Sequence, residues 1–205
     1  MTQVPSTIFR AYDIRGVVDE TLTEAGVEAI GQAIGSEAQA RGESRVVVAR
    51  DGRLSGPRLI KALTRGLTAS GCDVVDIGMV PTPVLYFATH TLEGTRSGVM
   101  LTGSHNPPDY NGLKMVLGGE TLSGEAITAL YTRLQNGDLR EGQGQVSEHD
   151  VRDAYLKRIL EDVSLSGSIK AVVDCGNGVA GELGPRLVEQ LGADTVPLFE
   201  DIDGN

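Results

Sequence analysis

Runs of β-branched residues alternate along this chain with stretches of helical periodicity. The segments "RVVVAR" (45–50), "DVVDIG" (73–78) and "SGVMLTG" (97–103) are each typical of a short buried strand. Apolar side chains recur at helical spacing over residues 23–41, and again after Pro57, a residue type that favours the first turn of a helix. Because strands that alternate with helices form sheets covered by helices, the pattern predicts an α/β fold.

The next segments extend this predicted domain. A third helix is expected over residues 84–92, and a fourth over residues 123–136. The segment "LKMVLGG" (113–119) reads as a strand close enough in sequence to strand 97–103 to pair with it as a hairpin. A hairpin inside a parallel sheet gives a layered α/β domain with a mixed, mostly parallel sheet.

A polar segment without periodicity, residues 137–150, is the best candidate for a linker. We therefore predict a first domain over residues 1–148 and a second over residues 149–205. The second is expected to hold a helix, a strand, a glycine-rich turn, a helix and a strand, over residues 151–163, 169–175, 176–178, 179–191 and 194–200. One such unit buries too little surface to stand alone, so we expect an incomplete second domain of similar design, and a chain that is a fragment.

The charge balance narrows the function classes. The chain has 18 Lys and Arg against 28 Asp and Glu, a net charge of −10, and no basic patch, so nucleic acid and anionic membrane surfaces are not expected partners. It has neither a signal-peptide pattern nor a long apolar run, which indicates a cytoplasmic protein, and nothing indicates an obligate protein partner. Cys72 and Cys175 lack disulfide or zinc-site spacing and are interpreted as buried apolar residues.

The most informative segment is the loop "TGSHNPPDYNGLKM" (102–115), which places Ser104 directly after an apolar strand. The Pro107–Pro108 pair restricts the backbone, and Asn111–Gly112 is expected to turn the chain back into the sheet, so the loop should hold one shape. If the flanking strands pair, Lys114 lies near the strand end that presents Ser104. A solvent-facing lysine on an edge strand is the alternative.

Ser104 has two interpretations. A hydrolase with Ser104 as nucleophile and His105 as base is disfavoured, because Thr102 and Asn106 stand where the GxSxG elbow needs glycine. A serine that carries a phosphoryl group fits better, since a rigid loop, a nearby lysine and remote arginines supply the positioning and charge stabilisation that dominate phosphoryl transfer.

Arginines near the N-terminus are a second candidate site. The segment "FRAYDIRG" (9–16) brings Arg10, Tyr12 and Arg15 together beside apolar residues. Its guanidinium groups are able to grip a phosphate with two hydrogen bonds each. The alternative is an edge strand whose arginines pair with the abundant carboxylates, and both interpretations stay open.

A third candidate is "VVDCGNGVAG" (172–181), in which three glycines satisfy the pattern GxGxxG between a predicted strand and helix. These are Gly176, Gly178 and Gly181, with Glu200 nineteen residues further on. The pattern is that of the nucleotide-binding domain of an oxidoreductase, with the pyrophosphate at the helix N-terminus. Tight packing of strand against helix is favoured instead, because the unit is incomplete and Asp174 would repel a phosphate.

Together, "FRAYDIRG", "TGSHNPPDYNGLKM" and "VVDCGNGVAG", in this order and spacing, resemble the α-D-phosphohexomutase family, with the resemblance running from about residue 8 to residue 205. The resemblance implies an enzyme that interconverts hexose 1-phosphates and hexose 6-phosphates, as the bacterial members for mannose and glucose phosphates do. The resemblance further implies a hexose 1,6-bisphosphate as intermediate and activator. It also implies that the glycine-rich segment is a structural turn.

The family's residue roles are then expected at matching positions. Ser104 would be the phosphorylated carrier and a Mg²⁺ ligand through its phosphate. His105, Lys114 and Arg15 would assist proton transfer and charge stabilisation, and Tyr12 and Arg15 would contact the sugar phosphate. The other Mg²⁺ ligands, on an aspartate-rich loop, would follow residue 205, so the fragment alone is expected to be inactive. A phosphoglucosamine mutase and a non-catalytic sugar-phosphate-binding module remain as alternatives.

Overall fold

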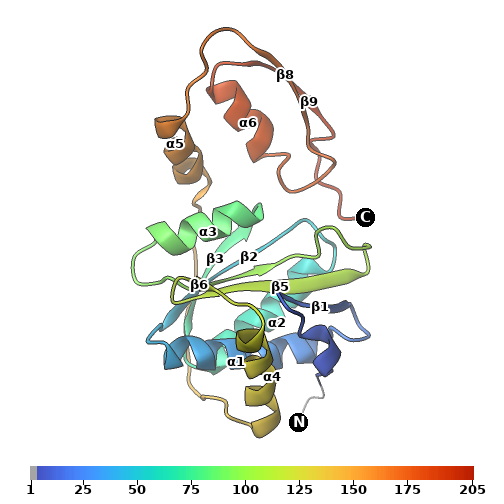
Figure 1. The fold of residues 1–205 in the computed structure, drawn as a ribbon, viewed down its shortest axis with the longest axis vertical. Helices are drawn as coiled ribbons and strands as arrows, with labels where there is room; N and C mark the ends of the chain where they lie inside the picture. Colours follow the sequence, from blue (N-terminus) through green and yellow to red (C-terminus); the bar gives the residue numbers. More distant parts are fainter. Residues whose placement is uncertain (1–3) are drawn as a thin grey trace.

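The computed structural model describes residues 4–205, which form a large α/β part and a smaller part stacked on it (Figure 1). The first part contains η1 (Ser6–Ile8), β1 (Ile14–Val17), α1 (Glu24–Ala40), β2 (Arg45–Arg50), α2 (Gly56–Ala69), β3 (Asp73–Met79), α3 (Thr82–Thr91), β4 (Gly98–Leu101), β5 (Tyr110–Leu117), β6 (Glu120–Thr121), α4 (Glu125–Asn136) and β7 (Val146–Glu148). The second contains α5 (Arg152–Asp162), β8 (Lys170–Asp174), α6 (Leu183–Gln190) and β9 (Asp194–Leu198).

The large sheet is mixed, which confirms the predicted fold class. Its strands lie in the order β1-β5-β4-β2-β3-β7, and β6 pairs with β5. Strand β2 runs parallel to β3 and β4, and β7 runs parallel to β3, whereas β5 is antiparallel to both β4 and β1. Parallel strands end at the same edge of a sheet, so the loops that follow β2 and β4 lie side by side.

Helices cover both faces of this sheet: α1, α2 and α4 lie on one face, and α3 lies on the other (Figure 1). Helix α1 begins where predicted, because the Thr23 hydroxyl oxygen accepts a hydrogen bond from the Gly26 amide at 3.1 Å as its N-cap. Helices α1 and α2 pack with their backbones in contact, since a Cβ atom added at Gly31 would lie 2.6 Å from the carbonyl oxygen of Leu63.

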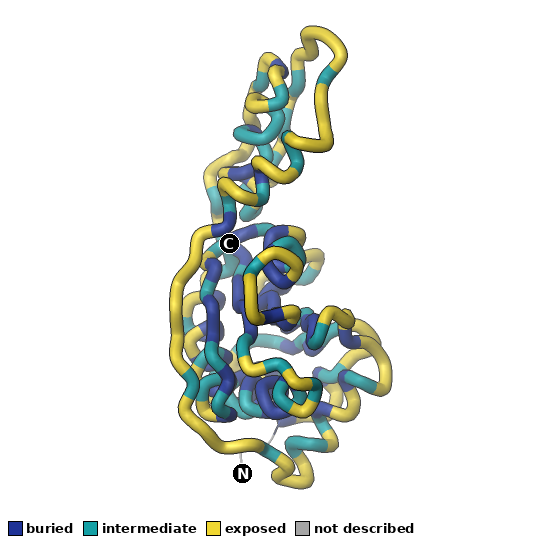
Figure 2. Tube along the Cα trace, turned by 90° about the vertical axis from the view of Figure 1, so that its left-hand side faces the viewer, coloured by how far each residue is buried: buried dark blue, intermediate teal, exposed yellow. Residues whose placement is uncertain are grey.

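The core has two layers because successive strand residues point to opposite faces. On β2, Val46 and Val48 pack toward α1 and α2, whereas Val47 and Ala49 pack toward α3. Figure 2 shows that buried residues are concentrated in the first part, while the second part is largely exposed or half-buried. Cys72 is buried in the first layer, as predicted. The same prediction is wrong for Cys175, which is only half-buried because it follows β8 in the largely exposed second part.

Helix α3 also makes an apolar contact between the two parts. Leu156 of α5 and Leu183 of α6 join its apolar layer. The rings of Phe87 and Tyr155 meet edge to face with their centroids 5.5 Å apart. The second part is therefore seated on the first through an apolar contact. None of the helices within residues 4–205 is long and apolar enough to cross a membrane.

Residues 137–150, expected to be a linker, instead pack along the first part. The amides of Gly142 and Gly144 donate hydrogen bonds to carbonyl oxygens of Ala69 and Thr68 at 2.8 and 2.9 Å. Strand β7 then adds to the edge of the sheet beside β3. Composition alone did not predict this, because a polar edge strand has the same residue types as a loop.

The small part pairs β8 with β9 in parallel, as one βαβ unit. Helix α6 begins at Leu183, four residues later than the predicted start at residue 179. The residues before it form successive turns instead, since the Gly178 amide donates to the carbonyl oxygen of Cys175 and the Gly181 amide to that of Gly178. The side chains of Val172 and Phe199 are 63% and 61% exposed, so this small sheet buries little apolar surface.

Candidate active site

The predicted serine loop projects from the carboxyl edge of β4, beside the turn that follows β2. Ser104 and His105 are both exposed at its tip. His105 has φ of +67°, a left-handed conformation that costs a non-glycine residue about 1–3 kcal/mol and persists only where its surroundings impose it. The contacts behind the tip are what impose it.

Asp51, at the end of β2, anchors the start of the loop. One of its carboxylate oxygens accepts hydrogen bonds from the Thr102 hydroxyl group at 2.8 Å and from the Gly103 amide at 3.0 Å. The other accepts from the Arg53 amide at 3.0 Å. The Thr102 hydroxyl oxygen in turn accepts from the Ser104 amide at 3.2 Å. Asp51 therefore fixes the backbone of the residues that lead to Ser104.

Arg53 fills the inside of the loop. Its guanidinium group donates hydrogen bonds to the backbone carbonyl oxygens of Gly103, Asn106, Pro107 and Tyr110. A Cβ atom added at Gly103 would lie 2.6 Å from Cζ of Arg53, so the loop closes around the guanidinium with no room for a side chain there. Asp51 and Arg53 were not predicted as site residues, because "DGRLSG" was interpreted only as a turn. Two charged residues at the carboxyl end of a buried strand were the available signal.

The predicted turn at Asn111–Gly112 is wrong, because both residues lie within β5. Asn111 is fully buried, and its side-chain amide donates to the Ser55 hydroxyl oxygen at 2.9 Å. Gly112 lies against β1, where an added Cβ would come 2.5 Å from the carbonyl oxygen of Ile14. The pair therefore serves close packing at the base of the loop rather than chain reversal.

Arg15 reaches the loop from the edge strand β1. Its Nη1 donates a hydrogen bond to Oδ1 of Asn106 at 3.1 Å, and its Nε lies 3.8 Å from a carboxylate oxygen of Asp13. The segment is an edge strand, and Arg15 pairs with a carboxylate, as one interpretation expected. The phosphate-binding interpretation stays a prediction. Arg10 is exposed, and the Tyr12 side chain is 77% exposed.

Lys114 lies on β5 and pairs with Met100, the penultimate residue of the antiparallel neighbour β4. Met100 packs toward α3, so Lys114 is on that face of the sheet. Arg15 pairs with Gly112, two residues before Lys114, so both cations share one face near the serine loop. Lys114 has no ion-pair partner within residues 4–205, so its charge is available to an anion.

The second part of the chain supplies the opposite wall. A cleft of about 420 Å³ is lined by the serine loop, by residues 51–53, and by residues 176–179 and 203–205. A Cβ atom added at Gly204 would lie 2.5 Å from the carbonyl oxygen of Gly52, so the two parts touch backbone to backbone beside Ser104. The candidate site therefore lies between the two parts.

The glycine-rich turn faces this cleft without being prepared for a pyrophosphate. Its amides are already bonded within the chain: Gly176 donates to Asp174, Asn177 to Phe199, and Gly178 to Cys175. Gly181 is packed against the backbone of Glu200, where an added Cβ would lie 2.8 Å from the carbonyl carbon. These contacts support the packing interpretation of GxGxxG over the dinucleotide one.

The carboxylates in the cleft do not form a metal cage. Among residues 4–205, no group of three or more His, Cys, Asp or Glu side chains is arranged to hold a metal ion. Asp51 is committed to its own hydrogen bonds. Asp203 accepts from the amide and side chain of Asn205, and these hydrogen bonds lower the pKa of its carboxyl group. The residues of this chain therefore do not fit a Mg²⁺ site by themselves.

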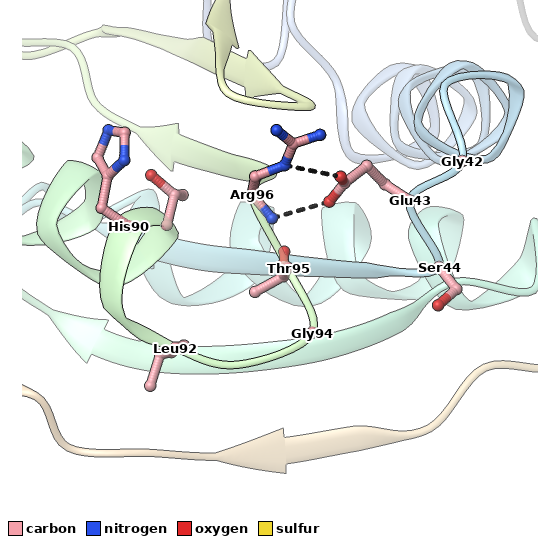
Figure 3. A pocket seen from close by; sticks show the side chains of 9 residues that line it. Gly42, Glu43, Ser44, His90, Leu92, Gly94, Thr95 and Arg96 are labelled. Carbon is pink, nitrogen blue, oxygen red and sulfur yellow. Dashed lines mark hydrogen bonds and ion pairs between the residues drawn. The ribbon is translucent and has the colours of Figure 1, made fainter.

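A second pocket, of about 410 Å³, opens at the opposite end of the strands, where the chain enters β2 and β4 (Figure 3). Glu43 and Arg96 pair across it, with a 2.8 Å hydrogen bond from the Arg96 amide and a 3.6 Å ion pair. His90 is the other titratable side chain lining it. Because its one carboxylate is already paired, this pocket offers less chemistry than the cleft at Ser104.

Comparisons with known proteins agree with one another. Residues 6–141 match the family model described as "Phosphoglucomutase/phosphomannomutase, alpha/beta/alpha domain I". A phosphomannomutase/phosphoglucomutase from Pseudomonas aeruginosa is 57% identical over 98% of this chain and 43% of its own length. A phosphoglucomutase from Neisseria gonorrhoeae is 47% identical over 100% of this chain and 45% of its own length.

A similar fold is present in the crystal structure of a phosphoglucomutase/phosphomannomutase family protein from Burkholderia thailandensis. It superposes with a TM-score of 0.95 at 51% identity, and covers 99% of this chain and 46% of that one. The chain thus spans less than half the length of the relatives that it matches.

Proposed function

The chain belongs to the phosphoglucomutase/phosphomannomutase family, and on that premise we propose that its site serves a mutase in which Ser104 carries the phosphoryl group. The substrates are the 1-phosphates and 6-phosphates of glucose and mannose. One observation supports this most directly: an exposed serine at the tip of a loop whose backbone is fixed from behind.

The proposed reaction consists of two successive phosphoryl transfers, each of a different phosphoryl group. The bond between phosphorus and Oγ of Ser104 breaks as a hydroxyl oxygen of the hexose monophosphate bonds to phosphorus, and the proton of that hydroxyl group is returned to Oγ. The hexose 1,6-bisphosphate then turns round in the site. Its other phosphoryl group is then transferred to Oγ of Ser104: the bond from phosphorus to the sugar oxygen breaks, and the serine proton passes to that oxygen. This leaves the isomeric monophosphate and a phosphorylated enzyme.

The cations near the loop have electrostatic roles in this proposal. Arg15 and Lys114 share one face of the sheet beside the serine loop. Positive charge held there stabilises a transferring phosphoryl group, which carries negative charge on its oxygens. His105, next to the carrier, and Lys114 are the proposed groups for proton transfer, and Tyr12 and Arg15 the proposed contacts to the sugar phosphate.

The described residues of the cleft do not by themselves provide a ligand set for Mg²⁺. Enzymes that transfer phosphoryl groups commonly use the ion to balance phosphate charge, and a phosphate on Ser104 would offer it oxygen ligands. The carboxylates that the cleft contains are hydrogen-bonded within the chain, as described above.

The test is a mutase assay on the complete gene product, with glucose 1-phosphate, mannose 1-phosphate and glucosamine 1-phosphate as separate substrates. Ser104→Ala should abolish isomerisation of the first two. Ser164→Ala, which alters an exposed serine outside the cleft, is the control and should leave the rate unchanged. Isomerisation by Ser104→Ala would overturn the proposal, and preference for the amino sugar would assign the phosphoglucosamine alternative.

A further inference from the structure

The guanidinium group of Arg53 donates hydrogen bonds to the serine loop from both of its terminal nitrogens. Nη1 donates to the carbonyl oxygens of Pro107 and Tyr110, and Nη2 donates to those of Gly103 and Asn106. A guanidinium group has four hydrogens on its two terminal nitrogens, so all four are used. The remaining N–H group, at Nε, lies 3.7 Å from a carboxylate oxygen of Asp51.

These contacts offset the electrostatic repulsion between carbonyl groups that a tight loop brings together. Four backbone carbonyl groups converge on one point, and their negative ends would repel one another without a cation between them. The side chain of Arg53 is only 14% exposed, so water does not substitute for it readily. Hydrogen bonds from a charged donor are roughly twice as strong as neutral ones, which suits a group that must hold a strained loop.

The same contacts matter for a phosphate on Ser104. Carbonyl oxygens that turned outward would place negative charge beside the phosphoryl group, whereas here four of them are held inward. Arg53 also lines the cleft together with Ser104, so its positive charge favours a phosphate at that place. Lysine has the charge but carries three donors on a single nitrogen, and lacks the planar fork that reaches four acceptors.

We propose that Arg53 is a positioning residue for phosphoryl transfer: it fixes the geometry of the serine loop, and thereby the place of the phosphorus atom, without contacting the sugar. This inference rests on the proposed function of Ser104. A misplacement of reacting atoms by about 1 Å lowers a rate by about 100-fold, which sets the expected size of the effect.

The experiment compares Arg53→Lys with Arg65→Lys in the complete gene product. Arg65 is a half-exposed arginine of α2 that pairs with Glu28, outside the cleft. For Arg53→Lys we expect kcat to fall about 100-fold while KM for glucose 1-phosphate changes less than about threefold. Arg65→Lys should match the wild type in both. An unchanged kcat in Arg53→Lys, or a fall that merely follows the unfolded fraction in a melting curve, would overturn the inference.

A second readout separates this inference from the proposed function. Within the loop, the Asn106 amide donates to the Gly103 carbonyl, and the Tyr110 amide donates to the Pro107 carbonyl, both at 3.1 Å. These two amides should exchange with deuterium slowly in the wild type and at least 10-fold faster in Arg53→Lys. If the wild type shows no mutase activity, the proposed function fails. The exchange rates still test whether Arg53 fixes the loop, because equal protection of these amides in the wild type and in Arg53→Lys would overturn that role.

Discussion

The carboxylate of Asp51 accepts a hydrogen bond from the Thr102 hydroxyl group at 2.8 Å, across 51 residues of sequence. Asp51 directly follows β2 and Thr102 directly follows the neighbouring parallel strand β4, so the sheet topology brings them together. The position of Ser104 therefore depends on the whole α/β part and is not a property of the loop sequence alone.

Asp51→Asn should destabilise the chain and disorder the loop. Asparagine keeps the shape but loses one acceptor oxygen and the charge facing Arg53, which leaves buried donors unpaired at a cost of about 1–3 kcal/mol. Urea denaturation of the chain measures this loss. Asp138→Asn, which removes an exposed carboxylate paired with Arg133, is the control and should cost less than about 1 kcal/mol. Equal losses in the two variants would contradict the assigned role of Asp51.

Arg15→Met should lower mutase activity more than Arg10→Met. Arg15 is bonded to Asn106 of the serine loop and lies beside the cleft, whereas Arg10 is exposed and has no ion pair among the described residues. Loss of one charged donor to a phosphate corresponds to about 1.5–3 kcal/mol, or about 10-fold to 150-fold in kcat/KM. Steady-state kinetics of both variants check it, and similar effects of the two changes would place the phosphate away from Arg15.

Local patterns predicted the fold well because its elements are locally specified. Thr23 caps α1, and the β-branched runs form β2, β3 and β4 as expected. A linker was predicted over residues 137–150, where β7 adds to the sheet, because edge strands and loops share a polar composition. A turn was also predicted at Asn111–Gly112, because the packing of β1 against Gly112 is a tertiary contact that the local sequence does not encode.

The candidate site was predictable in part. Ser104 was singled out from the restricted loop that carries it, and the structure places it exposed at the tip of that loop, where the nearby Asn106 contacts Arg15. Its role as phosphate carrier stays a prediction. Arg53 was missed because its contacts with the loop span 50 to 57 residues of sequence, which no local pattern encodes.

The two thiols should differ in reactivity. Cys72 is fully buried, and burial raises the pKa of its thiol, while Cys175 is half-buried and its pKa is also raised by burial. The thiolate is the reactive form, so labelling of Cys175 should accelerate as the pH rises from about 7 to about 9. Cys72 should label only after unfolding. Peptide mass spectrometry after iodoacetamide treatment distinguishes them, and rapid labelling of native Cys72 would contradict the packing of β3.

The isolated 205-residue chain should turn over glucose 1-phosphate at least about 1,000-fold more slowly than the full-length Pseudomonas aeruginosa relative. Its described residues do not form a metal cage, and it spans 43% of that relative's length. A coupled assay on both proteins at equal concentration makes the comparison. Comparable rates would mean that the cleft between the two parts suffices for catalysis.

The central claim is that Ser104 carries the phosphoryl group, and the mass of the protein tests it most directly. The complete gene product should gain the mass of one phosphate after incubation with glucose 1,6-bisphosphate, and peptide mapping should place it on Ser104. The Ser104→Ala variant should gain none. An active preparation without phosphate, or with its phosphate on another residue, would contradict the account.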